Sequence, residues 1–187
     1  MIKFEEFKEV CQQSIEMIEA AGLLLTPEDK KKITAADFGL NHIKKEGVQI
    51  LTMFQTDRIA GKILVLLPNQ TEPEHWHPTV GNDPGKEEVI RAISGELYFY
   101  IPGENNMTQG FIVDGKEDCY TMRNEVVLNP GDQLVLPAGT KHWFQAGKKG
   151  AVMYSFSTTV TDLMDQFTDQ NIVRDTIIEQ EPSNSTY

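Results

Sequence analysis

The stretch that decides the fold runs from residue 73 to residue 95 and reads PEHWHPTVGNDPGKEEVIRAISG. His75 and His77 flank a single residue, and alternate residues of a β-strand face the same side, so both imidazoles can point into one barrel. Glu88 follows a glycine-containing loop, and Gly95 follows Glu88 after six intervening residues. Further along, PAGTKH places His142 just after a second turn.

These residues predict one divalent metal site with four ligands, namely His75, His77, Glu88 and His142. Imidazole binds Zn, Fe, Ni, Cu or Mn, and a carboxylate shifts the preference toward harder ions such as Mn²⁺ and Fe²⁺. A structural zinc site would be closed and richer in thiolates, and neither cysteine lies near the cluster in sequence. An isolated HxH pair is more often structural. The additional Glu, Gly and PxGxxH elements favour an open catalytic site, where two positions of a six-coordinate ion stay free.

Short segments rich in β-branched or aromatic residues surround this cluster, and turn residues separate them. Short, regularly punctuated strands of this kind favour a β-sandwich or small barrel over alternating βαβ units. The predicted strands are Val48–Met53, Ile59–Leu67, Glu88–Ile93, Glu96–Ile101, Glu125–Leu128, Gln133–Leu136 and Val152–Phe156.

The first part of the chain has helical rather than strand periodicity. Apolar residues recur at helical spacing between residues 4 and 18, and Gly22 is a natural stop. Thr26 and Pro27 then indicate the start of a second, short helix that runs to about Thr34. We expect a single domain over residues 1–187, with a helical extension (1–46), a metal-binding barrel (47–172) and a C-terminal tail (173–187), of which residues Glu179–Tyr187 are expected to be frayed.

The composition bears on which partners the protein can bind and on where in the cell it is located. The 187 residues carry a formal net charge of −11, which disfavours binding to nucleic acid or an anionic membrane. The N-terminus lacks the basic flank and apolar run of a signal peptide, and the sequence has no apolar stretch long enough to span a bilayer. Together with two cysteines that form no CxxC pair, this predicts a cytoplasmic protein.

The spacing resembles the two motifs of the cupin family, HxH-Glu-(six)-Gly and PxGxxH. The resemblance implies an all-β fold, a cupin-type double-stranded β-helix (jelly-roll) barrel. Three features depart from the family pattern. The gap from His77 to Glu88 is ten residues rather than three or four, Asn69 replaces a glycine before HxH, and Ala146 replaces an asparagine after the last histidine. The longer gap, Pro78–Glu87, implies a loop inserted over the metal site. It leaves Glu87 and Glu88 as alternatives for the carboxylate ligand. The six-residue step of the motif to Gly95 favours Glu88, and Glu87 would then face away or into the loop.

Several segments are more specific and resemble the D-lyxose isomerase group of cupins: DFGL (37–40), PEHWHP (73–78), GKEE (85–88), TKHWFQAG (140–147) and FTD (167–169). This resemblance covers about residues 26–169. It implies a metal-dependent aldose–ketose isomerase that uses Mn²⁺, with Fe²⁺, Co²⁺, Ni²⁺ and Zn²⁺ as alternatives. The implied monosaccharide substrates are D-lyxose and D-xylulose, with D-mannose and D-fructose as a second candidate pair.

Isomerisation of an open-chain sugar needs a group that shuttles a proton between C1 and C2, unless a hydride shift replaces it. Lys86, Asp169 and Glu74 are the catalytic candidates. Lys86 should share the face of Glu88, and Asp169 sits in the segment that can fold across the barrel mouth. Glu74 directly precedes a ligand, and its side chain should face the opposite side unless the strand bulges. A solvated loop lysine is the alternative for Lys86.

Two other functions remain open at this point, an Fe-dependent cupin dioxygenase and a non-catalytic sugar-binding cupin. By analogy with other cupins, we also expect a homodimer.

Overall fold

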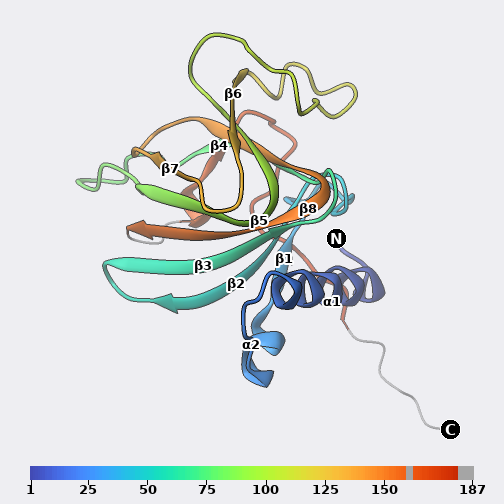
Figure 1. The fold of residues 1–187 in the computed structure, drawn as a ribbon. Helices are drawn as coiled ribbons and strands as arrows, with labels where there is room; N and C mark the ends of the chain where they lie inside the picture. Colours follow the sequence, from blue (N-terminus) through green and yellow to red (C-terminus); the bar gives the residue numbers. More distant parts are fainter. Residues whose placement is uncertain (159–161, 181–187) are drawn as a thin grey trace, which may run out of the picture.

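Two long strands, β5 (Glu88–Ile101) and β8 (His142–Thr158), pair with each other along the centre of a curled antiparallel sheet (Figure 1). The computed structural model describes residues 1–158 and 162–180. Pairing follows the order β1-β2-β3-β8-β4-β9, and β5 also pairs with β6 and β7. The remaining strands are β1 (Thr34–Ala36), β2 (Val48–Gln55), β3 (Ile59–Leu66), β4 (Thr71–Trp76), β6 (Asn124–Leu128), β7 (Gln133–Leu136) and β9 (Gln166–Phe167).

The barrel closes around an apolar core, which confirms the predicted all-β class. Strand residues such as Leu66, Ile90, Leu97 and Phe99 are at most 1% exposed and belong to one hydrophobic cluster. Because successive side chains of a strand alternate between faces, these residues fill the interior while their neighbours face outward. The core lies beside the histidine cluster, since Phe99 and His142 stack with ring centroids 6.2 Å apart.

Three of the predicted strands differ markedly in extent from the strands of the structure. The segments predicted as Glu88–Ile93 and Glu96–Ile101 form one strand, β5, because register shifts near Ser94 and Gly95 accommodate the turn-like residues without ending the pairing. The strand predicted to begin at Val152 begins at His142. This earlier start brings the third histidine into the sheet rather than into a preceding loop.

The helices form the predicted N-terminal extension. Helix α1 (Phe4–Ala20) packs Ile18 against β-strand residues such as Ile63 and Val65 on the outer side of the sheet (Figure 1). Helix α2 (Pro27–Lys32) begins with a capping box in which the Thr26 side chain accepts from the Asp29 backbone N–H. The short strand β1 then joins the sheet, which the sequence pattern did not predict. None of the described helices is long and apolar enough to cross a membrane.

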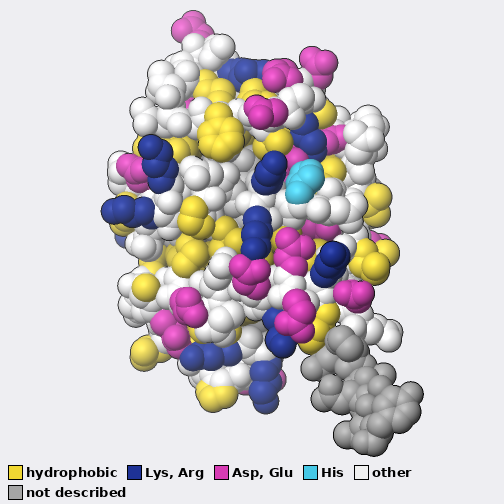
Figure 2. Space-filling view, turned by 90° about the vertical axis from the view of Figure 1, so that its right-hand side faces the viewer, with side chains coloured by type: hydrophobic (Ala, Val, Ile, Leu, Met, Phe, Trp, Pro, Cys, Tyr) yellow, Lys and Arg dark blue, Asp and Glu magenta, His cyan; other side chains and the backbone are white. Residues whose placement is uncertain are grey.

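The two ends of the described chain meet beside the barrel. Ile2 N donates to Ile177 O at 2.8 Å, and Glu179 N donates to Ile2 O at 2.9 Å. Glu179, the first residue predicted to be frayed, is therefore bonded to the N-terminal segment, whereas residues 181–187 lie outside the described residues. On the face in Figure 2, acidic and basic side chains intermingle, so the described residues of that face form no uniformly basic patch.

Gly95 marks a position where two backbone segments approach closely. A Cβ at Gly95 would lie 2.0 Å from Gly150 O, and the residue has a φ of +78°. We predict that Gly95→Ala lowers the free energy of unfolding by about 3–4 kcal/mol, because it adds a backbone clash to the left-handed strain.

Gly115→Ala is the matched control for this substitution. Its φ is +77°, and no described atom lies within 4 Å of the added Cβ, so we expect a loss of only about 1 kcal/mol. Urea denaturation measures both variants. Equal losses in the two would show that the close approach at Gly95 does not matter.

Candidate metal centre

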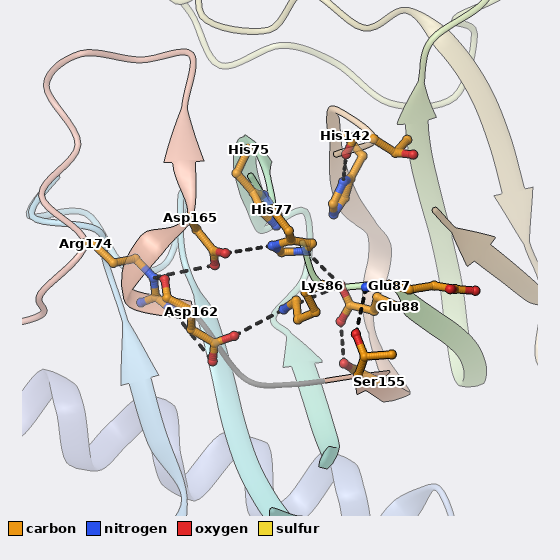
Figure 3. Close-up of polar contacts among 12 residues, drawn as sticks. His75, His77, Lys86, Glu87, Glu88, His142, Ser155, Asp162, Asp165 and Arg174 are labelled. Carbon is orange, nitrogen blue, oxygen red and sulfur yellow. Dashed lines mark hydrogen bonds and ion pairs between the residues drawn. The ribbon is translucent and has the colours of Figure 1, made fainter. Parts of the chain in front are cut away.

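Three histidines meet at one end of the barrel (Figure 3). His75 lies near the end of β4, His77 just follows that strand, and His142 is the first residue of β8. The antiparallel register pairs His75 directly with His142, so the two imidazoles are neighbours across the sheet. All three are buried, and one ring nitrogen of each lies within 4.8 Å of those of the other two. The structure therefore brings together the three histidines that the sequence predicted as ligands.

Each imidazole has its Nδ1 atom bonded to an oxygen that can only accept. His75 Nδ1 donates to Pro73 O at 2.8 Å, and His142 Nδ1 donates to Thr140 O at 2.8 Å. His77 Nδ1 donates to Asp165 Oδ1 at 2.7 Å. In the neutral rings of His75 and His142 the proton is then on Nδ1, so the lone pair is on Nε2 and available to a metal. Burial would lower the pKa of His77, but Asp165 and Glu88 raise it overall, so a metal would replace the proton on its Nε2.

Glu88 lies beside the three rings, at the start of β5. Its Oε2 is 3.2 Å from His77 Nε2, and its Oε1 accepts from Ser155 Oγ. Burial would raise the pKa of Glu88, but Lys86 and His77 outweigh burial and hold it well below its usual range. Glu87 is exposed, as its predicted orientation away from the site requires.

The donor set fits a divalent ion on two further observations. His142 Nε2 is buried and has no hydrogen-bond partner among the described residues, so an electrophile is the missing partner of that lone pair. Burial lowers the pKa of His142 to about 4, and burial together with His142 and His77 lowers the pKa of His75 well below its usual value. Both rings are thus neutral at pH 7, which is the form that binds metal.

Lys86 points into the site, where acidic groups surround it. Its Nζ lies 3.8 Å from Glu88 Oε2 and 3.2 Å from Asp162 Oδ1. Burial would lower the pKa of Lys86, but the nearby carboxylates Glu88, Asp162 and Asp165 raise it overall, so the group stays an ammonium. Lys62 also donates to Asp162, through Oδ2.

The segment after β8 contributes two aspartates and an arginine that were not predicted from the sequence (Figure 3). Asp165 accepts a hydrogen bond from His77, and Arg174 Nε lies 3.8 Å from Asp165 Oδ2. Arg174 Nε also donates to Asp162 O at 2.9 Å. None of these residues belongs to the motifs around the histidines. Two aspartates three residues apart, followed nine residues later by an arginine, match no functional motif that could be recognised in a single sequence.

Glu74 and Asp169, two of the predicted catalytic residues, do not line this site. Glu74 is 1% exposed, and its carboxylate accepts from the backbone N–H groups of Thr121 and Met122 and from the Thr168 hydroxyl. Asp169 pairs with Lys116 at 2.9 Å. These contacts connect the loop before β6 and the segment after β9 to the barrel.

A small cavity of about 30 Å³ adjoins His75 and Glu88, with room for about one water molecule. Charged groups and a few apolar strand residues line it, including Glu72, a carboxyl outside the motifs. Burial, followed by the charge of Glu88, raises the pKa of Glu72 to about 8. The cavity is lined by Val48, Ile50, Lys62, Leu64, Glu72, His75, Lys86, Glu88, Phe144, Ser155, Asp162, Asp165 and Arg174.

Known proteins resemble the chain over most of its length. A family model described as D-lyxose isomerase matches residues 32–186. A D-lyxose ketol-isomerase of Cohnella laeviribosi is 44% identical over 175 residues, 93% of this chain and 96% of that protein. A D-lyxose/D-mannose isomerase of Thermosediminibacter oceani is 42% identical over 175 residues, 93% of this chain and 97% of that protein.

Solved structures agree on the architecture. An L-ribose isomerase of Acinetobacter sp. DL28, in complex with L-ribose, matches with a TM-score of 0.77 at 15% identity. The match covers 95% of this chain and 98% of that chain. At this identity the likeness shows a shared fold, and the predicted cupin-type barrel is thereby confirmed.

Asp162 neutralises two buried ammonium groups, so its removal should destabilise the protein. We predict that Asp162→Asn lowers the free energy of unfolding by about 3 kcal/mol at pH 7, because Lys62 and Lys86 lose their shared carboxylate. Burial would raise the pKa of Asp162, but Lys86 and Lys62 lower it from 3.8 to about 2. A depressed pKa stabilises the fold above 3.8, and that contribution disappears as the pH falls toward 2.

The difference between wild type and variant should therefore shrink as the pH falls from 4 to 2. Urea denaturation across this pH range measures it. Asp175→Asn, at an exposed position, should stay within about 0.5 kcal/mol of wild type. An Asp162→Asn variant as stable as wild type at pH 7 would contradict this account of the ion pairs.

Proposed function

Because this chain belongs to the D-lyxose isomerase family, we propose that it is a metal-dependent enzyme that interconverts D-lyxose and D-xylulose, and also D-mannose and D-fructose. Membership of the family makes the protein a sugar isomerase. The observation that supports metal dependence is the convergence of His75, His77 and His142, whose Nδ1 atoms are all bonded to oxygen.

We propose that these three Nε2 atoms and the Glu88 carboxylate hold one divalent ion, with Mn²⁺ as the native metal. A divalent ion held by these residues would supply Lewis acidity, which would polarise the oxygens of the open-chain sugar and stabilise the negative charge that develops on them. The Ser155 hydroxyl donates to Glu88 Oε1, which leaves Oε2 on the side of the histidines. Asp165 orients His77 in the same way as carboxylates orient metal-binding histidines elsewhere.

Lys86 acts in this proposal as a cation rather than as a base. Its contacts with Glu88 and Asp162 favour the ammonium form, which has three donors and no acceptor. It is therefore suited to donate a hydrogen bond to a sugar oxygen and to stabilise charge there. The predicted catalytic roles of Glu74 and Asp169 stay untested, and their hydrogen bonds support an anchoring role instead.

The sugar needs more room than the cavity of about 30 Å³ provides. Binding must therefore displace side chains at the mouth, and the Asp162–Lys86 ion pair is the contact we expect to rearrange. Sugar hydroxyls can replace the hydrogen bonds that these side chains lose. Family membership favours the isomerase over a dioxygenase or a non-catalytic binder. Cytoplasmic location and a homodimer stay predictions.

The ligand set and the activity are tested together. Protein stripped of metal and reloaded with Mn²⁺ should convert D-lyxose into D-xylulose, measured by chromatography. Glu88→Gln should bind Mn²⁺ at least 10-fold more weakly and lose activity at limiting metal, because an amide oxygen is a neutral and weaker ligand.

Glu87→Gln is the control, because Glu87 is the adjacent carboxylate and is exposed. It should match wild type in metal content and turnover. A Glu88→Gln variant with wild-type metal affinity would show that Glu88 is not a ligand. An inactive, Mn²⁺-loaded wild type would contradict the proposed substrate.

A further inference from the structure

Glu72 enters the cavity from strand β4, although strand alternation predicts the opposite direction. Residues three apart on a regular strand face opposite sides, so Glu72 and His75 should diverge. Here Glu72 pairs with Phe144 and His75 pairs with His142, so three steps along β4 match two steps along β8. The extra residue is a bulge at Pro73 and Glu74, and it places both Glu72 and His75 at the cavity.

Glu72 differs from the other acids of the cavity in its hydrogen bonding. Glu88 accepts from Ser155, Asp162 accepts from two lysines, and Asp165 accepts from His77. Glu72 Oε2 is buried and has no hydrogen-bond partner among the described residues. A buried carboxyl oxygen without a partner is costly, so such a group needs a partner from outside the protein.

The position of Glu72 places its carboxyl group beside the proposed reaction centre. Glu72 Oε1 lies 4.0 Å from His75 Nε2, the ring atom that faces the proposed metal. Lys86 and Arg174 line the same cavity but have only donors, so they cannot accept a proton as cations. Asp162 is occupied by Lys62 and Lys86.

We propose that Glu72 is a catalytic residue, the carboxylate that carries a proton between C2 and C1 of the open-chain sugar. This role rests on the proposed isomerase function. The carboxylate takes the C2 hydrogen as a proton, and the electron pair of the C2–H bond forms a C1=C2 double bond while O1 gains negative charge. Glu72 then returns the proton to C1, the proton of the O2 hydroxyl moves to O1, and C2=O2 forms. The step consumes no external oxidant or reductant.

The test compares Glu72→Gln with wild type in the Mn²⁺-loaded enzyme. The amide keeps the size and polarity of the side chain but cannot take up the proton. We expect kcat for D-lyxose to fall between 100- and 10,000-fold, the usual contribution of an acid–base group. Metal content and the melting temperature should match wild type, and KM should stay within about threefold.

A second variant covers the case in which Glu72→Gln does not fold. Glu72→Asp keeps the carboxylate but withdraws it by one methylene, so kcat should fall 10- to 100-fold. Glu96→Gln, an exposed carboxylate on β5, is the control and should retain wild-type kinetics.

Three outcomes would overturn the role of Glu72. They are wild-type kcat in folded Glu72→Gln, wild-type kcat in Glu72→Asp, and loss of bound metal in Glu72→Gln, which would make Glu72 a ligand instead. Wild type that forms no ketose under the same conditions would overturn the proposed function itself, and this role with it.

Discussion

The site depends on the antiparallel pairing of β4 with β8, which places His75 opposite His142. Hydrogen bonds from each ring's Nδ1 to a carbonyl or carboxylate then fix its tautomer and its rotation. A change of one residue in this register would turn His75 outward, because side chains alternate along a strand. The fold therefore prearranges the ligands before any metal binds, and little conformational entropy is left to lose on binding.

Around the histidines, the protein encloses more charge than a core tolerates unless the charges are paired. Lys62 and Lys86 share Asp162, while Arg174 lies close to Asp165. Such pairs persist in a low-dielectric site only where each partner compensates the other. The pairing leaves a polar site that can exchange protein contacts for sugar hydroxyls. It also explains why the segment after β8, which carries three of these groups, belongs to the site despite its distance in sequence.

Local rules predicted the parts of the site that depend on short spacing. The alternation of His75 and His77 and the step from Glu88 to Gly95 are readable because they lie within one strand or across one turn. Gly95 is required where it approaches Gly150 O. Asn69 replaces a family glycine without consequence for the backbone, since its φ is +59° and asparagine tolerates the left-handed region.

The same local rules could not predict which strands pair when they lie far apart in the sequence. Asp165 and Arg174 lie on either side of β9 and reach the site because β9 pairs with β4, which no local pattern specifies. Glu72 was missed for a different reason, because alternation places it opposite His75 and only the bulge at Pro73 reverses this. Glu74 was favoured for its position next to a ligand, yet its side chain faces away and bonds to Thr121.

Anomalous diffraction from a crystal of the Mn²⁺-loaded protein tests the central claim most directly. The account predicts one strong anomalous peak per chain, within bonding distance of Nε2 of His75, His77 and His142 and of a Glu88 carboxylate oxygen. A peak bound through other residues, or a metal-soaked crystal without a peak between the three histidines, would contradict it.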